Sequence, residues 1–118
     1  MFPRSLRLRE KRLFDSAFRR GSWARGKYFS VVHMSLAGTG KIGFVVTKKV
    51  TKHATERNRI KRRMRAALQQ VLVNPAYQDL LRNKALVIVV HQSVTSLPFA
   101  QLLTEITHVL DKVQMGRS

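Results

Sequence analysis

The chain has 118 residues, of which 44% are hydrophobic, so it can fold as one domain around a modest core, and this excludes a disordered polyelectrolyte. Its 23 Lys and Arg residues against six Asp and Glu give a net charge of +17, which points to nucleic acid as a partner and, more distantly, to an anionic membrane. The absence of cysteine excludes disulfides and thiolate metal sites, and no apolar run approaches the ~18 residues of a transmembrane helix. The N-terminus also lacks the apolar core of a signal peptide, so we expect a cytoplasmic protein.

The positive charge is concentrated in the first part of the chain. Residues 1–65 contain 19 basic and three acidic residues, whereas residues 66–118 contain four and three. No linker or internal repeat divides the chain, so we predict a single domain over 1–118. Within it, residues 1–9 are expected to form a flexible basic arm that becomes ordered on binding. We expect the first part to meet the polyanion and the second to complete the core.

A short helix is predicted over residues 10–20, with Gly21 ending it. Its helical spacing places Phe14 beside Phe18. Two interpretations of this pair remain open. Both rings could belong to the core, or one edge could stay exposed as a platform on which unpaired bases stack, each contributing ~1–3 kcal/mol.

Three strands are predicted next. Residues 22–24 form a short one, and residues 27–36 alternate as a long one, with Phe29 and Val31 on one face and Val32 and Met34 on the other. Residues 37–40 contain two glycines and are predicted to be a hairpin connection to a partner strand over residues 41–47.

A basic helix follows the loop of residues 47–54. Thr55 is the predicted N-cap and Glu56 lies in the first turn, where a negative charge favours the helix dipole. An apolar stripe recurs at helical spacing, made of Ile60, Met64, Ala67, Leu68 and Val71. The residues between 48 and 65 hold nine Lys and Arg residues and a single carboxylate, and like charges three or four residues apart destabilise a helix. A polyanion is the simplest explanation, although a solvated basic face is the common alternative.

In the second part of the chain, the predicted helices and strands serve to complete the core. Asn74-Pro75 ends the basic helix, and one more short helical turn follows before residue 82. Residues 85–90 are uninterruptedly apolar, which is typical of a central strand covered on both faces. A last helix opens at Ser96-Leu97-Pro98, and its predicted buried stripe is Phe99, Leu102, Leu103, Ile106, Leu110 and Val113.

The sequence offers no catalytic constellation. A two-metal nuclease needs several carboxylates converging on ions ~3.5–4 Å apart, and the six carboxylates here are dispersed. The four histidines have no metal-ligand spacing. We therefore predict no catalytic residue and no metal site in the protein itself.

The residues also carry a family resemblance. The string Glu56-Arg57-Asn58-Arg59-Ile60-Lys61-Arg62, preceded by the strand-like residues 42–49, resembles the Arg-Asn-Arg signature of the bacterial ribonuclease P protein component. The phenylalanine pair with Gly21, the apolar strand 86–90 and the last helix extend the resemblance over nearly the whole chain. It implies an α+β single domain with a mixed sheet of about four strands packed by helices. It also implies a rare left-handed βαβ crossover, the ribosomal protein S5 domain 2-like fold, where the general rule favours a right-handed one.

The resemblance further implies a function. In that family the RNA subunit is the catalyst of an endoribonuclease, a hydrolase that uses Mg²⁺ to remove the 5′ leader from precursor tRNA, and the protein assists it. The partners would be the ribonuclease P RNA and the precursor tRNA, with no membrane and no obligate protein partner, and Mg²⁺ would act with the RNA.

The family's site residues carry over onto two groups. The RNA-binding group is Lys48, Lys49, Lys52, Arg57, Asn58, Arg59, Lys61, Arg62 and Arg65. The leader-binding cleft would contain Phe14, Phe18, Ser30 and Val32, although the family often has larger apolar or aromatic residues at the last two positions.

Other functional classes stay open at this point. A structural RNA-binding protein would show the same charge and core but would change no cleavage rate. A self-sufficient endoribonuclease would need the missing carboxylate cluster. DNA binding has the least support, because nothing resembles a helix-turn-helix pair.

Overall fold

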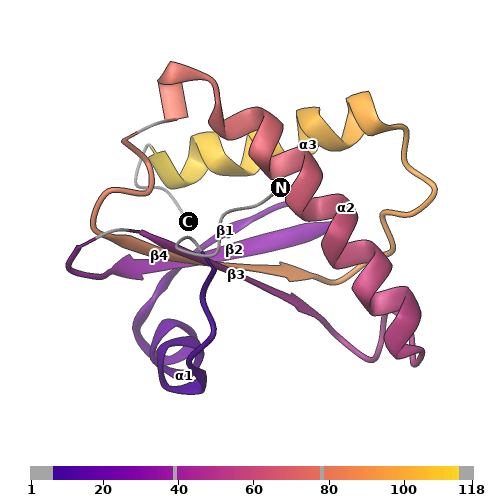
Figure 1. The fold of residues 1–118 in the computed structure, drawn as a ribbon, viewed down its shortest axis with the longest axis horizontal. Coiled ribbons are helices and arrows are strands. Elements are labelled where there is room, and N and C mark those ends of the chain that lie inside the picture. The colour runs from indigo at the N-terminus through magenta and orange to yellow at the C-terminus, as the bar shows by residue number, and fades with distance from the viewer. Residues whose placement is uncertain (1–6, 39, 78, 115–118) are drawn as a thin grey trace.

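The computed structural model describes residues 7–38, 40–77 and 79–114, and these form a mixed sheet with helices on both faces (Figure 1). The elements are α1 (Lys11–Arg20), β1 (Ser22–Arg25), β2 (Phe29–Ser35), β3 (Lys41–Val46), α2 (Ala54–Leu72), a 3-10 turn η2 (Pro75–Tyr77), β4 (Lys84–Val90) and α3 (Phe99–Gln114). The predicted α+β class is confirmed. Each predicted helix and strand is present, including the short turn after Asn74-Pro75.

The strand order is β1-β2-β4-β3, so the apolar strand β4 lies inside the sheet as its sequence predicts. It pairs antiparallel with β2 and parallel with β3. The predicted hairpin between residues 27–36 and 41–47 is therefore wrong, because β4 lies between these two strands. The physical reason is the composition of β4: a strand that is apolar on both faces gains most from an inside position, where both edges are paired and both faces are covered.

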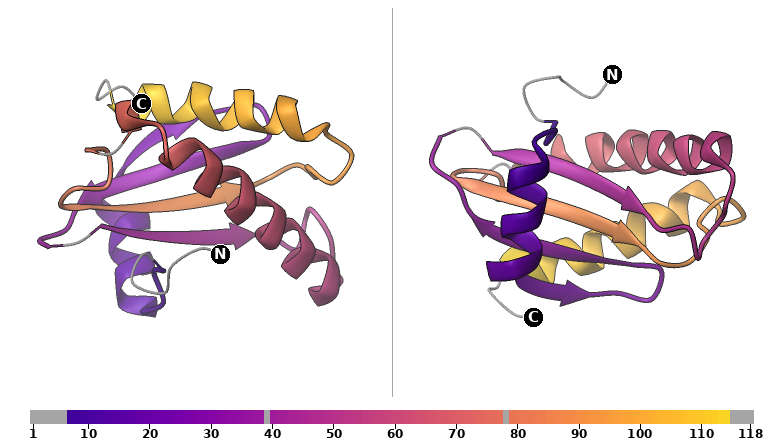
Figure 2. Two further views of the ribbon diagram at one scale, coloured as in Figure 1. Left: turned by 45° about the horizontal axis from the view of Figure 1, so that its top comes forward. Right: turned by 90° about the horizontal axis from the view of Figure 1, so that it is seen from below.

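The connection from β3 through α2 to β4 is a βαβ crossover between adjacent parallel strands. Figure 2 (left) shows it from the helix side, with β3 and β4 both pointing right and β4 above β3. When the strands are turned to point up, β4 lies to the left of β3 with α2 in front, which is the left-handed sense. The crossover handedness that the family resemblance implies is thus present, against the strong general preference for the right-handed form.

Helices α2 and α3 cover one face of the sheet (Figure 1) and enclose the main core. The predicted α2 stripe is confirmed, since all five of its apolar residues are buried. On α3 the buried residues are Leu102, Ile106, Val109, Leu110 and Val113. Phe99 is a correction to the predicted α3 stripe: it is 38% exposed, because it lies at the first turn of the helix and packs under the guanidinium of Arg63 instead of the sheet.

Helix α1 crosses the opposite face of the sheet by itself (Figure 2, right). A small buried cluster of Leu8, Ala17, Val32 and Val87 lies beneath it. Gly43 of β3 allows the close approach of the helix, because a Cβ atom there would lie 2.5 Å from Cζ of Phe14. The α1 side of the sheet is therefore only partly covered, and this leaves surface on either flank of the helix.

Part of the predicted basic arm is held against the sheet. Residues 1–6 lie outside the described residues, but Arg7 forms a parallel bridge with Ile42, and the N–H of Leu8 donates to the Ile42 carbonyl at 2.8 Å. Leu8 is buried. The described end of the arm thus contributes to the cluster under α1, because an apolar residue follows the bridge.

Candidate nucleic-acid interface

The loop that leads into α2 is fixed by side chains at its base. The helix begins at Ala54 with His53 as the N-cap residue, so the predicted Thr55 cap is wrong. No side chain of the described residues caps the helix; instead, the Thr51 hydroxyl links the loop to the first turn, because it donates to Glu56 at 2.9 Å and accepts from the His53 N–H at 3.3 Å. Arg57 donates to the carbonyls of residues 51 and 52, at 3.2 and 2.9 Å. The loop is therefore ordered by the same residues that start the helix.

This loop and the first half of α2 present a continuous basic surface, here defined as Lys48, Lys49, Lys52, Asn58, Arg59, Lys61 and Arg62. All of these residues are exposed except Lys61, which is half-buried on the flank of the helix. Within residues 7–38, 40–77 and 79–114, none of these cations has an ion-pair partner. Glu56 is the one carboxylate between residues 48 and 65, and Thr51 already engages it. The basic surface therefore carries an uncompensated positive charge.

Two arginines of the same charge run turn away from this surface and hold α2 in place. Arg63 donates to the carbonyl of Leu97 and lies 5.9 Å from the ring centroid of Phe99. Arg65 lies 5.5 Å from the ring of Phe44 on β3. Burial, and then the nearby Arg7 guanidinium, lower the pKa of Arg65 from its usual value. The predicted RNA-binding residues Arg57 and Arg65 are thus partly occupied by contacts within the protein.

A second candidate surface lies on the α1 side of the sheet. Phe18 is 41% exposed and packs against Trp23 of β1, with ring centroids 6.0 Å apart and a tilt of 32°. The guanidinium of Arg25 lies 5.2 Å from the centroid of the Trp23 ring. We call Phe18, Trp23 and Arg25 the aromatic surface. Trp23 was not predicted as a site residue; because β1 extends to Arg25, one residue beyond the predicted strand, Trp23 and Arg25 share one face of the sheet.

The other predicted cleft residues lie deeper. Phe14 is half-buried over Gly43, and Val32 is 0% exposed beneath α1. Ser30 is 4% exposed, and its hydroxyl lies 3.4 Å from Nε2 of His91. In the sheet register Ser30 is paired with Val89 of β4, and Val89 is paired with Val45 of β3. These residues form the floor beside α1, whereas Phe18 presents an exposed ring and Trp23 a half-buried one.

The donor groups of the described residues do not fit a metal site. Within residues 7–38, 40–77 and 79–114, no group of three or more His, Asp or Glu side chains is placed to hold a metal ion. In the same ranges, no helix combines the length and the apolarity needed to cross a bilayer. Neither the basic surface nor the aromatic surface contains a carboxylate that could act as an acid or a base.

The fold and these surfaces define a small α+β domain with a left-handed crossover and a strongly cationic crossover helix. The family model for ribonuclease P matches residues 2–114, and the chain belongs to this family. It is 32% identical to the ribonuclease P protein component of Pseudanabaena over 98% of this chain and 97% of that protein. It is 36% identical to that of Finegoldia magna over 92% of this chain and 91% of the relative.

Solved structures share the fold at lower identity. A Staphylococcus aureus RNase P protein mutant with defective mRNA degradation activity superposes with a TM-score of 0.73 at 20% identity, over 93% of this chain and 89% of that one. The Thermotoga maritima RNase P protein, in complex with 1-(4-fluorophenyl)-2-thiourea, superposes with a TM-score of 0.72 at 22% identity, over 90% and 98%. Bacterial RNase P proteins therefore have the same sheet and helices as this chain.

Proposed function

We propose that this chain is the RNA-binding protein subunit of a cytoplasmic ribonuclease P, which assists a catalytic RNA in removing the 5′ leader from precursor tRNA. The observation that carries the proposal is the pairing of family membership with two separate surfaces. One is the uncompensated basic surface on α2 and its loop, and the other is the exposed aromatic surface beside α1. A subunit that must hold two polyanions together needs such a pair of surfaces.

The basic surface would bind the RNA subunit through phosphates. Lys48, Lys49, Lys52, Arg59, Lys61 and Arg62 are six cations, and neutralising six phosphates gives a slope of log affinity against log salt near about −5. Asn58 would bond a phosphate or a sugar hydroxyl beside them. Measuring the affinity for the RNA subunit between ~50 and ~200 mM salt gives this slope. A slope shallower than about −2 would contradict the assignment.

The aromatic surface would bind the leader, which is single-stranded and therefore has unpaired bases. The exposed ring of Phe18 and the half-buried ring of Trp23 offer stacking platforms, and Arg25 places a cation beside them for the leader phosphates. Phe14, Ser30 and Val32 would shape the floor and contact the leader less, because they are half-buried or buried.

The protein would lower the Mg²⁺ concentration that the reaction needs. Its excess positive charge screens the repulsion between the catalytic RNA and its substrate. Since the described side chains do not converge on a metal site, the Mg²⁺ ions would be held by the RNA, and no step of the chemistry is assigned to this chain.

Cleavage of a precursor tRNA at low Mg²⁺ tests the proposal. The samples are a bacterial ribonuclease P RNA, this protein, and the two together. We expect only the mixture to cleave. No effect of the protein would leave a structural RNA-binding role in its place, and cleavage by the protein alone would contradict our reading of its carboxylates.

A further inference from the structure

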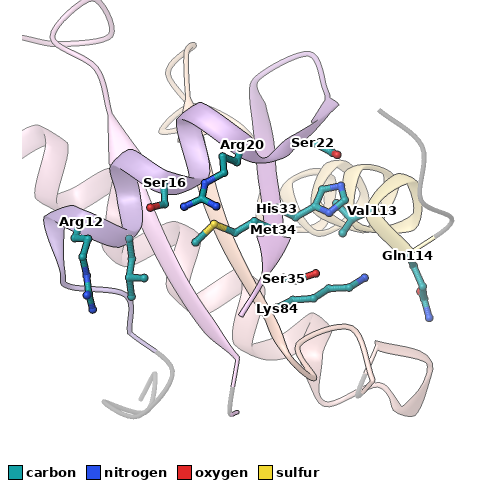
Figure 3. Close-up of a pocket in the computed structure, with 11 residues that line it drawn as sticks. Arg12, Ser16, Arg20, Ser22, His33, Met34, Ser35, Lys84, Val113 and Gln114 are labelled. Atoms are coloured by element: carbon teal, nitrogen blue, oxygen red, sulfur yellow. The ribbon is translucent and has the colours of Figure 1, made fainter. Parts of the chain in front are cut away.

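The flank of α1 opposite Phe14 and Phe18 borders a second hollow, which the proposed function does not use. Figure 3 shows it between α1, the end of β2, the start of β4 and the end of α3. Its volume is about 800 Å³. On α1 it is lined by Arg12, Ser16 and Arg20, which recur every four residues and so share one side of the helix. Helix α1 thus separates this pocket from the aromatic surface.

The charge of the pocket is positive. Its charged lining residues are Arg12, Arg20 and Lys84, and no carboxylate lines it. Arg12 is bonded to Glu10 at 3.0 Å in an exposed pair, which in water is easily exchanged. Among the described residues, Arg20 and Lys84 have no ion-pair partner. Two cations on separate elements, one on α1 and one on β4, therefore border the same hollow without a counter-charge.

His33 provides a polar group that also lacks a partner. Its Nε2 atom is buried and forms no hydrogen bond with the described residues. Burial, and then the positive charge of Lys84, lower the pKa of His33 from its usual value, which favours the neutral ring. An orphaned buried ring nitrogen is costly unless a ligand or water bonds to it. The hydroxyls of Ser16, Ser22 and Ser35 line the same pocket.

The pocket is open because β1 is shorter than its neighbour. The register of β1 with β2 ends at the pair Ser22 and His33, whereas β2 continues to Ser35 along β4. The edge of β2 at Met34 and Ser35 is therefore free on the β1 side and lies at the pocket. Leu13 and Met34 add apolar surface beside the cations.

We propose that this pocket binds the phosphate group of a nucleotide, with Arg20 and Lys84 as the charge partners, His33 as a hydrogen-bond partner, and Leu13 and Met34 beside the sugar. Arginine, lysine and serine hydroxyls are the groups that bind phosphates in proteins. The volume is large enough to hold a whole nucleotide unit, and not only its phosphate. The source of the phosphate is an RNA strand that continues past α1 or a free nucleotide. The choice of RNA rests on the proposed function, whereas the phosphate chemistry does not.

The imidazole signals of the free full-length protein report binding directly. The protein is titrated at constant ionic strength with inorganic phosphate, with uridine 5′-monophosphate and with a short single-stranded RNA. An anion beside Lys84 offsets the part of the His33 pKa lowering that the charge of Lys84 causes, so we expect each ligand that binds to raise this pKa. If the His33 pKa rises only with the RNA, the ligand of the site is an RNA strand. If it rises with all three ligands, the site binds a free phosphate or nucleotide. No response of His33 to any of them would overturn the proposal.

Charge-matched variants separate this site from non-specific attraction. Arg20→Gln and Lys84→Gln each remove a cation from the pocket, and we expect each to lower the affinity for the ligand that shifts His33 by about tenfold. Arg19→Gln and Arg82→Gln remove the same charge from neighbouring exposed residues that do not line the pocket, and we expect less than a twofold change. Equal losses in all four variants would overturn the proposal.

Two features keep this test informative. Thermal unfolding of each variant shows whether it folds, and Arg20→Gln serves if Lys84→Gln is unstable, since Arg20 is exposed on α1. The titration uses no RNA subunit, so its failure leaves the precursor-cleavage test intact. Conversely, a protein that fails to assist cleavage can still bind phosphate at His33.

Discussion

The two faces of the sheet are covered to different extents, and the difference separates the part of the chain that holds the fold from the parts that we expect to bind RNA. Under α2 and α3, the described residues form a hydrophobic core of 22 buried side chains, whereas the hydrophobic cluster under α1 has only four. The α1 face retains the exposed ring of Phe18 and an open pocket on the two flanks of one short helix. A face with little buried area can present binding groups at little cost in stability.

The basic surface lies on the outer side of the well-packed face. Because the apolar stripe of α2 is buried along its length, the opposite side of the helix is held in place from beneath. The repulsion between its arginines is offset by the core beneath them. The predictions below test this division of stability and binding, from the largest expected effect to the smallest.

The largest effect should come from the core under α2. Leu68 is fully buried there, and we expect Leu68→Ala to lower the free energy of unfolding by about 3 kcal/mol, because it leaves a cavity. Leu13 belongs to α1 and is half-buried against the small cluster beneath that helix, and Leu13→Ala should cost about 1 kcal/mol. Urea unfolding followed by circular dichroism measures both. Equal losses would show that the two faces contribute alike.

On the α1 face, removing an exposed ring should affect binding more than stability. We expect Phe18→Ala to lower the affinity for precursor tRNA about tenfold, since one stacking partner is lost. The affinity for tRNA without a leader is the control and should not change. Trp23 is the only tryptophan, so its fluorescence in the wild-type protein should respond to a leader oligonucleotide. If Phe18→Ala lowered the affinity for leaderless tRNA equally, the assignment of this surface to the leader would be wrong.

Two neighbouring arginines of α2 should separate binding from stability. Arg62 is exposed, so Arg62→Ala should leave the free energy of unfolding unchanged and make the salt slope for the RNA subunit less steep by about 0.9. Arg63 is bonded to Leu97 and packs on Phe99, so Arg63→Ala should lower the free energy of unfolding by about 1 kcal/mol. Salt titrations and urea unfolding of both variants check this. The comparison fails if Arg62→Ala is the less stable of the two.

The smallest expected effect depends on pH and belongs to the packed face. The phenol of Tyr77 donates to Asp111 at 2.7 Å, and burial, followed by this carboxylate, raises the pKa of Tyr77. Above pH ~10 the unfolded tyrosine loses its proton while the folded one retains it, so the unfolding free energy should fall as pH rises through this range. Tyr77→Phe should cost about 0.5 kcal/mol at pH 7 and remove this part of the pH dependence. Urea unfolding at pH 7 to 10.5 measures it, and an unchanged pH dependence in the variant would contradict the assignment.

Local patterns in the sequence predicted most of the elements but not the strand pairing. The alternation that predicts residues 27–36 and 41–47 as strands is present in β2 and β3, yet it contains no information about which edges meet. A short glycine-containing connection favours a hairpin, and only the need to cover β4 on both edges overrides it. The left-handed crossover came from the family resemblance, because hydrophobic periodicity is the same in either hand.

The sequence predicted most of the residues that make up the candidate site, but not which of them are free to bind a ligand. The run of cations between residues 48 and 65 is evident from sequence, but Arg57, Arg62 and Arg65 look alike there. Their neighbours distinguish them: Arg57 meets two loop carbonyls, Arg65 meets Phe44, and Arg62 meets solvent. Similarly, the strand pattern places Ser30 and Val32 on the α1 face, but only the position of the helix shows that Val32 is covered.

By itself, the sequence determined the class of the domain, the helices and strands, the buried stripe of α2 and the large positive charge. These depend on local spacing and composition, which a linear chain fully contains. The tertiary structure alone decided the order of the strands, the pairing of Phe18 with Trp23 and the pocket at the short end of β1. These depend on contacts between residues far apart in the chain, and such contacts are chosen by the total area that the whole fold can bury.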